Sequence, residues 1–182
     1  MAMTCGRDTL ALLVVDVQER LMPAMDCRER VTANVAVLLR AAARLGVPIV
    51  TSEQYPKGLG PTIAELGNLI PGDRIWPKAV FSVMRDAVLR DQVGRLGRRG
   101  IVVVGVESHV CVMQTALDLL RTGYRPTVVA DATSSRTAEN REHALRRLAA
   151  RGADVATTEM VLFEWLGRAG TDAFRELSPL IR

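Results

Sequence analysis

The sequence predicts an α/β fold in three layers, with a six-stranded parallel sheet covered by helices on both faces. Short β-rich runs alternate with amphipathic helical stretches along the chain, and the runs are apolar throughout rather than at every second residue. Strands of this kind are typical of parallel sheets, whose two faces are both covered by helices. At 182 residues, the chain is expected to form one domain, 1–182.

The first third of the chain contains two predicted strands and one helix. A continuous apolar run over 10–17 ends in an acid and predicts a strand buried on both faces. Apolar residues at a helical period over 28–45, followed by Gly46, predict a helix and its end. A second strand is expected over 47–51. The stretch 53–62 holds two prolines and two glycines and predicts an exposed loop.

The rest of the chain continues the alternation. Strands are predicted over 75–83, 100–106, 126–131 and 153–157, and helices over 86–96, 109–122 and 138–151. Ser108 is a candidate N-cap for the 109–122 helix, and the C-terminal remainder is expected to be mostly helical. In the strand order 3-2-1-4-5-6, ligands bind beyond the carboxyl ends of strands one and four, where the order reverses.

Composition excludes several classes of protein. The formal net charge is +4 and the sequence pI is near 9.4, but arginines are spread along the chain among acidic residues and aromatic residues make up 4%. Nucleic-acid modules usually concentrate positive charge on one face, often with stacking aromatics, so no nucleic-acid partner is expected. No apolar run approaches the length of a membrane span, and no secretory signal is recognised. A cytoplasmic protein without a membrane partner is therefore expected.

The cysteines and histidines do not form a metal or disulfide pattern. Cys5, Cys27 and Cys111 are odd in number and form no CxxC pair, and His109 and His143 are the two histidines. A disulfide framework and a structural zinc site are both disfavoured. No metal and no cofactor are expected. His109 is two residues from Cys111, and side chains at that spacing on a helix do not face each other.

Cys111 is the most informative single residue. It follows the carboxyl end of a predicted core strand and falls in the first turn of a predicted helix, where amide dipoles favour a thiolate. The alternative is a small buried apolar residue, as most free cysteines are. Cys5 and Cys27 have no comparable setting and are interpreted as bystanders.

Asp16 and Lys78 are the candidate charged partners of Cys111. Asp16 ends an apolar run, and a buried carboxylate is costly unless it is paired or functional; the alternative is a turn acid. Lys57 and Lys78 are the only lysines among 24 basic residues, which suggests that a compact ammonium is needed at position 78. Dinucleotide-binding, Walker and GxSxG patterns are absent from the sequence.

The motifs LLVVDVQ, TSEQYPKGLGPT, WPKAVFS and GVESHVCVMQTALDLL together resemble the isochorismatase-like cysteine hydrolase family, and the similarity covers nearly the whole chain. It implies a catalytic triad of Asp16, Lys78 and Cys111, in which the aspartate takes the thiol proton, the lysine stabilises the charged pair, and the thiolate attacks a carbonyl or related carbon to form a covalent intermediate. It also implies a homo-oligomer, a dimer or a tetramer.

The resemblance extends to the surroundings of the nucleophile. It places a cis peptide at Val106–Glu107, which would aim the amides of Glu107 and Cys111 at a developing oxyanion. Four residues within the same motifs are the candidate contacts of a small-molecule substrate: Gln18, Gln54, Tyr55 and Phe81.

One departure from the family pattern concerns metal binding. Nicotinamidases of this family bind a metal through an acid–x–histidine pair and a further histidine after strand two, whereas this chain has Ser52, Glu53, Gln54 and Tyr55 there. The retained Cys111 favours cleavage of a small amide or related C–N bond. Two alternatives stay open: vinyl-ether cleavage of the isochorismatase type, which needs only the acid and the lysine, and a binding module with little turnover.

Overall fold

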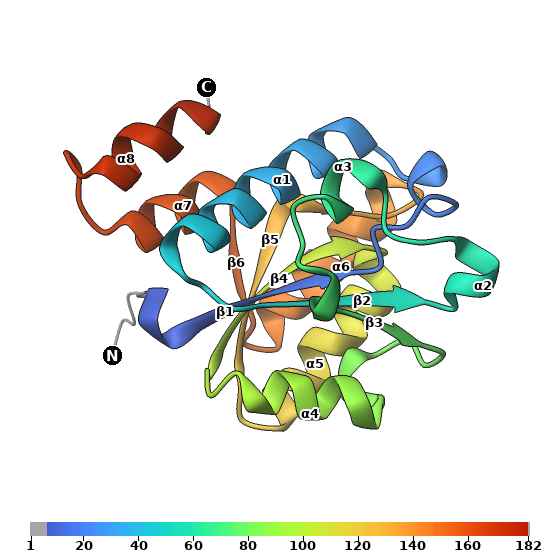
Figure 1. Cartoon of the computed structure of the whole chain (residues 1–182). Coiled ribbons are helices and arrows are strands. Elements are labelled where there is room, and N and C mark those ends of the chain that lie inside the picture. The colour runs from blue at the N-terminus through green and yellow to red at the C-terminus, as the bar shows by residue number, and fades with distance from the viewer. Residues whose placement is uncertain (1–6, 182) are drawn as a thin grey trace.

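The computed structural model describes residues 7–181 and has the predicted architecture. Within these residues six strands form one parallel sheet in the order β3-β2-β1-β4-β5-β6, with helices on both faces (Figure 1). The predicted fold class and strand order are therefore confirmed. The strands are β1 (Leu10–Val15), β2 (Ile49–Gln54), β3 (Ile75–Lys78), β4 (Gly100–Val106), β5 (Arg125–Ser134) and β6 (Asp154–Ala156).

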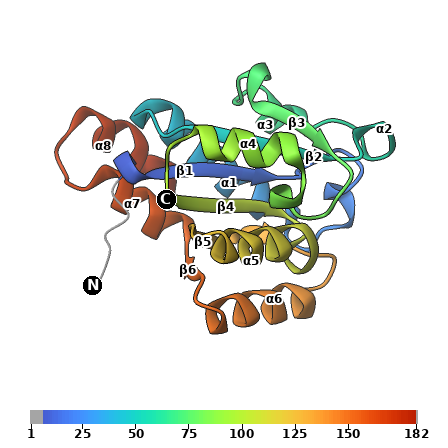
Figure 2. The ribbon, with the colours of Figure 1, turned by 90° about the horizontal axis from the view of Figure 1, so that it is seen from below.

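The helices divide into two layers, which Figure 2 shows from below. One face of the sheet is covered by α1 (Arg28–Leu45), α3 (Ala64–Gly67), α7 (Thr158–Leu166) and α8 (Asp172–Leu177), and the other by α4 (Ala87–Arg95), α5 (Met113–Arg121) and α6 (Ala138–Ala150). The short helix α2 (Pro56–Leu59) follows β2 beyond the edge of the sheet. The helical C-terminal remainder agrees with the prediction.

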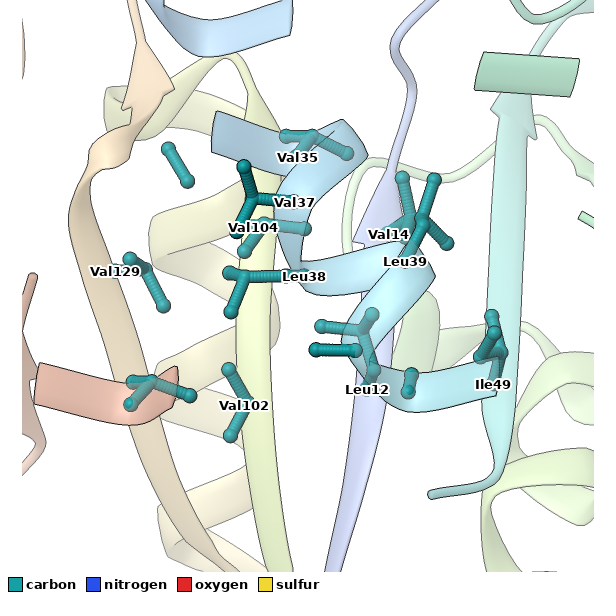
Figure 3. Close-up of a cluster of buried hydrophobic side chains, with 14 of the residues drawn as sticks. Leu12, Val14, Val35, Val37, Leu38, Leu39, Ile49, Val102, Val104 and Val129 are labelled. Atoms are coloured by element: carbon teal, nitrogen blue, oxygen red, sulfur yellow. The ribbon is translucent and has the colours of Figure 1, made fainter. Parts of the chain in front are cut away.

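Strand β1 explains why the apolar runs are continuous. Successive side chains of a strand point to opposite faces. Leu12 and Val14 belong to the core under α1, whereas Ala11 and Leu13 belong to the core under α4 and α5. All six residues of β1 are buried. Figure 3 shows Leu38 and other α1 side chains packed over the first of these faces.

Two helix boundaries follow the sequence signals closely. The 28–45 helix ends as predicted at Gly46, whose φ of 70° is left-handed and whose N–H is bonded to the Ala42 carbonyl. Helix α4 begins after Asp86, whose carboxylate accepts hydrogen bonds from the N–H groups of Val88 and Leu89.

Several boundaries near the carboxyl edge of the sheet were predicted incorrectly. β1 ends at Val15, because Asp16 turns into the left-handed region with a φ of 53°. β3 ends at Lys78 rather than at position 83, and the predicted 53–62 loop contains the last two residues of β2 and the helix α2. β5 continues to Ser134, three residues beyond its predicted end.

Ser108 does not act as the predicted N-cap. The 109–122 segment begins with a π-helical turn over Ser108–Val112 before α5, and its N-cap residue is Glu107, without a side-chain capping bond. The Ser108 hydroxyl is buried and has no hydrogen-bond partner. The strand therefore leads into a wider turn than an ordinary capped α-helix, and this turn carries Cys111.

Candidate active site

The sheet brings three of the predicted site residues to its carboxyl edge. Asp16 directly follows β1, Lys78 is the last residue of β3, and Cys111 lies in the π-helical turn that follows β4. Parallel strands end at the same edge, and β1 pairs with β4 where the strand order reverses. This is the edge at which α2 lies in Figure 1.

Asp16 and Lys78 form a fully buried ion pair. The Lys78 Nζ donates to Asp16 Oδ2 at 2.7 Å, and both side chains are 0% exposed. Ser52 on β2 donates its hydroxyl to the other carboxylate oxygen at 2.7 Å, a contact that sequence reasoning missed. Burial raises the pKa of Asp16 above its ordinary value, while the Lys78 ammonium and the Ser52 hydroxyl oppose this rise.

Cys111 is 7% exposed, and its thiol is close enough to Asp16 and Lys78 for both to change its pKa. Burial, followed by the Asp16 carboxylate, raises the pKa of Cys111 to about 12, and the Lys78 ammonium only partly opposes them. Burial therefore acts against the thiolate that the predicted helix start would favour, because desolvation penalises the charged form of the thiol.

Two glutamines predicted as substrate contacts form hydrogen bonds within the site. Gln18 is fully buried; its Nε2 donates to the carbonyls of Gln54 (3.0 Å) and Gly60 (2.7 Å), and its Oε1 accepts from the Gln54 N–H (2.7 Å). The Gln54 Oε1 accepts from Lys78 Nζ at 2.6 Å, and its Nε2 donates to the Ala79 carbonyl at 2.8 Å. With these partners, the Gln18 amide nitrogen has both of its N–H donors occupied, and the Gln54 amide binds the protein through its oxygen and one N–H.

Tyr55 and Phe81 are exposed beside the site, as substrate contacts would be. They are 59% and 53% exposed, and the Tyr55 N–H is bonded to the Lys78 carbonyl at 2.8 Å. The Tyr55 ring lies over Gly58 so closely that a Cβ there would meet its Cε1 at 2.4 Å. The absence of a side chain at Gly58 thus leaves room for the exposed Tyr55 ring.

The turn after β4 has a defined geometry. The Val106–Glu107 peptide bond is cis, at the position that the resemblance implies. The Glu107 carboxylate pairs with Arg136 at 2.7 Å, and His109 Nδ1 lies 2.9 Å from the Ser135 hydroxyl. The Nδ1 of His109 is thus hydrogen-bonded to the segment after β5. We therefore do not assign His109 as the base of Cys111.

Three of the four residues at the positions where the resemblance places the metal ligands of nicotinamidases have hydrogen-bond partners for their side chains. The Ser52 hydroxyl binds Asp16, Glu53 accepts from both the N–H (2.7 Å) and the hydroxyl (2.8 Å) of Thr62, and the Gln54 amide binds Lys78. Over residues 7–181, no cluster of three or more His, Cys, Asp or Glu side chains is arranged to hold a metal ion.

Among the described residues, Cys27 and the second histidine, His143, have no hydrogen bond or ion pair with Asp16, Lys78 or Cys111. Cys27 is exposed, with its sulfur 3.4 Å from an Asp26 carboxylate oxygen, and Cys5 lies outside the described residues. His143 is exposed on α6.

In the described part of the chain, no helix combines the length and the apolar character that crossing a membrane requires.

Comparisons with known proteins identify the family of this chain. The family model of the isochorismatase domain matches residues 10–160. Isochorismatase domain-containing protein 1 of Danio rerio is 39% identical over 174 residues, which cover 96% of this chain and 61% of the relative. The chain thus spans less than two thirds of the length of that relative.

Solved structures show the same fold. The MAR1 ribonuclease of Caenorhabditis elegans matches with a TM-score of 0.90 and 33% identity over 97% of this chain and 91% of its own. The YcaC protein of Escherichia coli, an octameric hydrolase of unknown specificity, matches with a TM-score of 0.93 at 22% identity over 99% of this chain and 91% of its own. With the family model covering most of its sheet and helices, this chain belongs to the isochorismatase family and has its hydrolase fold.

Proposed function

We propose that this chain is a cysteine hydrolase that cleaves an amide or related C–N bond of a small molecule, with Asp16, Lys78 and Cys111 as its catalytic residues. The observation that carries the proposal is a buried carboxylate–ammonium pair beside a nearly buried thiol. The carboxylate supplies a base and the ammonium a fixed positive charge, which is what a neutral thiol needs to become a nucleophile.

The first half of the reaction forms a thioester. Asp16 takes the proton of Cys111 while the sulfur bonds to the carbonyl carbon and the C=O π electrons move to the oxygen. The N–H groups of Glu107 and Cys111 are the proposed donors to this oxyanion. When the tetrahedral adduct collapses, the C–N bond breaks and the amine leaves with the proton that Asp16 holds.

The second half releases the acid. Asp16 takes a proton from a water molecule as the oxygen of that water adds to the thioester carbon. The C–S bond then breaks, and the sulfur recovers its proton from Asp16. Overall, one amide and one water give one carboxylic acid and one amine. Each proton moves between Asp16 and an adjacent atom, so the site needs no other base.

The raised pKa values of Asp16 and Cys111 favour direct proton transfer between the two groups. The base and the thiol interact directly, and burial raises the pKa of both. A base with a raised pKa takes a proton more readily than an ordinary carboxylate does. Because Asp16 must be ionised to act, kcat/KM is expected to rise with pH through the pKa of Asp16 and then level off.

The burial of the site favours a small substrate. Asp16 and Lys78 have no exposed side-chain surface and Cys111 has 7% exposure, so a large substrate has little direct access to the reacting atoms. The name of the similar MAR1 ribonuclease makes RNA a second candidate substrate. Cleavage of a vinyl ether by Asp16 and Lys78 alone is a third. By analogy with octameric YcaC, we propose a homo-oligomer as the working form.

A substrate panel with matched cysteine variants tests the proposal. The wild type, Cys111→Ala and, as the control, Cys27→Ala are each assayed with small amides, activated esters, a vinyl ether and a short RNA. We expect the wild type and Cys27→Ala to show burst kinetics with the ester and turnover with an amide, both lost in Cys111→Ala. Turnover that persists in Cys111→Ala, or activity with the vinyl ether or the RNA alone, would overturn the proposal.

A further inference from the structure

We propose that Gln54 is a positioning residue that holds the Lys78 ammonium between Asp16 and Cys111, and that Gln18 in turn holds Gln54. The inference rests on the proposed function only where turnover is measured.

The Lys78 ammonium has three N–H donors. Two of them have partners: Asp16 Oδ2 at 2.7 Å and Gln54 Oε1 at 2.6 Å. The third N–H of the ammonium can then point toward the Cys111 thiol.

The amide of Gln54 can face Lys78 in one orientation only. An ammonium offers donors and no acceptor, so the amide oxygen must point toward it. The amide nitrogen donates to the carbonyl of Ala79 at 2.8 Å, which also requires a donor at that end. Because Ala79 directly follows Lys78, one side chain binds both the ammonium and the backbone just beyond it.

The backbone of Gln54 is fixed in the same way. The Gln18 amide accepts from the Gln54 N–H and donates to the Gln54 carbonyl, and it also donates to Gly60. Gln18 lies two residues after Asp16 and is 0% exposed. A chain of part-buried hydrogen bonds therefore runs from the segment that carries Asp16, through Gln54, to Lys78, which pairs with Asp16.

A neutral acceptor at position 54 has a specific electrostatic consequence. Two contacts of 2.6 and 2.7 Å through Nζ place an oxygen at position 54 within roughly 5 Å of Asp16. The charged or titratable groups acting on Asp16 are Lys78 and Cys111. Nearby, Glu53 is bound by Thr62, and Glu107 is paired with Arg136. A carboxylate at position 54 would add a second negative charge and draw the ammonium away from the thiol.

The first test needs no substrate. The wild type, Gln54→Met, Gln54→Glu and the control Gln92→Met, on α4 outside the site, are treated with iodoacetamide at pH 8.5, and peptide mass mapping follows Cys111. We expect both Gln54 variants to slow alkylation of Cys111 at least about tenfold, the glutamate more, because a less well placed ammonium stabilises the thiolate less. Cys27, which is exposed, should react at the wild-type rate in all four proteins, which checks that the reagent acts equally on each sample.

The second test uses turnover. In Gln54→Met we expect kcat to fall about tenfold to a hundredfold with KM within about twofold, as for a misplaced catalytic group. In Gln54→Glu the rising limb of the kcat/KM profile should move up by about one pH unit, because a like charge raises the pKa of Asp16. The double variant Gln18→Met/Gln54→Met should lose no more than the worse single variant, since both act through one chain of contacts.

Two results would overturn the inference: wild-type alkylation of Cys111 in both Gln54 variants, or an increased KM with unchanged kcat, which would make Gln54 a substrate contact. Should Gln54→Met not fold, Gln54→Glu carries the test because it keeps an acceptor for Lys78. If no substrate is turned over by the wild type, the proposed function fails, while the alkylation result still decides the role of Gln54.

Discussion

Replacing Lys78 by methionine should cost stability in a way that depends on pH. The variant removes an ammonium whose side chain is fully buried and leaves Asp16 with the Ser52 hydroxyl and the thiol as neighbours. Breaking a buried pair from one side typically costs about 3–5 kcal/mol, because the remaining charge is uncompensated. Asp16 can escape part of that cost by taking up a proton in the folded state.

Protonation sets an upper limit on the electrostatic cost. The unfolded aspartate has a pKa of about 3.9, so holding a proton on it in the folded state costs about 4 kcal/mol at pH 7 and about 1.5 kcal/mol at pH 5. In Lys78→Met the pKa of Asp16 is expected to be higher in the folded than in the unfolded state. The free energy of unfolding of the variant therefore falls as pH rises and recovers as pH falls. The wild type, with its pair intact, should show a weaker change over this range.

Urea unfolding of the wild type and Lys78→Met at pH 5 and pH 7 measures this difference. The deficit of the variant should shrink by up to about 2.7 kcal/mol at the lower pH. Lys57→Met is the matched control, because Lys57 is exposed and is the other lysine of the chain; it should change stability by less than about 0.5 kcal/mol.

A double variant separates charge from packing. Asp16→Asn/Lys78→Met removes both charges and should recover most of the stability at pH 7, since apolar or neutral replacements of a buried pair are often tolerated. A deficit of Lys78→Met that is equal at pH 5 and pH 7, and that the double variant does not relieve, would refute the assignment of an uncompensated Asp16 charge.

Two further predictions concern the thiol and the metal. Alkylation of Cys111 should still accelerate about tenfold per pH unit above pH 10, since burial and Asp16 raise its pKa to about 12; a rate that levels off near pH 8 would contradict that environment. If a substrate is found, activity should survive exhaustive chelation, because Ser52, Glu53 and Gln54 already have protein partners. Loss of activity together with a stoichiometric metal would contradict this.

The fold was predictable because its signals are local and repeated. The continuous apolar run of β1 fills both cores, and Gly46 and Asp86 mark helix boundaries by their own backbone and side-chain chemistry. The errors cluster at the carboxyl edge. There, Asp16 ends β1 with a left-handed backbone and β3 ends at Lys78, so the chain leaves its periodic pattern where the site is built.

The site was predictable in its residue types but not in its partners. Asp16, Lys78 and Cys111 stand out because each breaks an apolar or arginine-rich context next to a strand end. The contact of Ser52 with Asp16 and that of Gln54 with Lys78 do not stand out, since a serine and a glutamine near the end of a strand carry no pattern that reveals their partners. Their roles depend on the β1–β2 and β2–β3 registers, which pair Val15 with Ser52 and Gln54 with Lys78. That register is a tertiary fact that a single sequence does not reveal.

Charge conservation explains why such a site can be fully buried. At rest it holds one anion, Asp16, and one cation, Lys78. In the proposed reaction, the proton moves from Cys111 to Asp16, the anion becomes the thiolate and the cation is unchanged, so the site would still hold one ion pair. Desolvation then penalises both states similarly, provided that the ammonium stays within reach of both anions. If the Lys78 ammonium had to move as the negative charge moves from Asp16 to Cys111, the cost of that movement would be added to the reaction. For this reason a neutral side chain that holds the ammonium in place, such as Gln54, suits the proposed chemistry better than a second carboxylate.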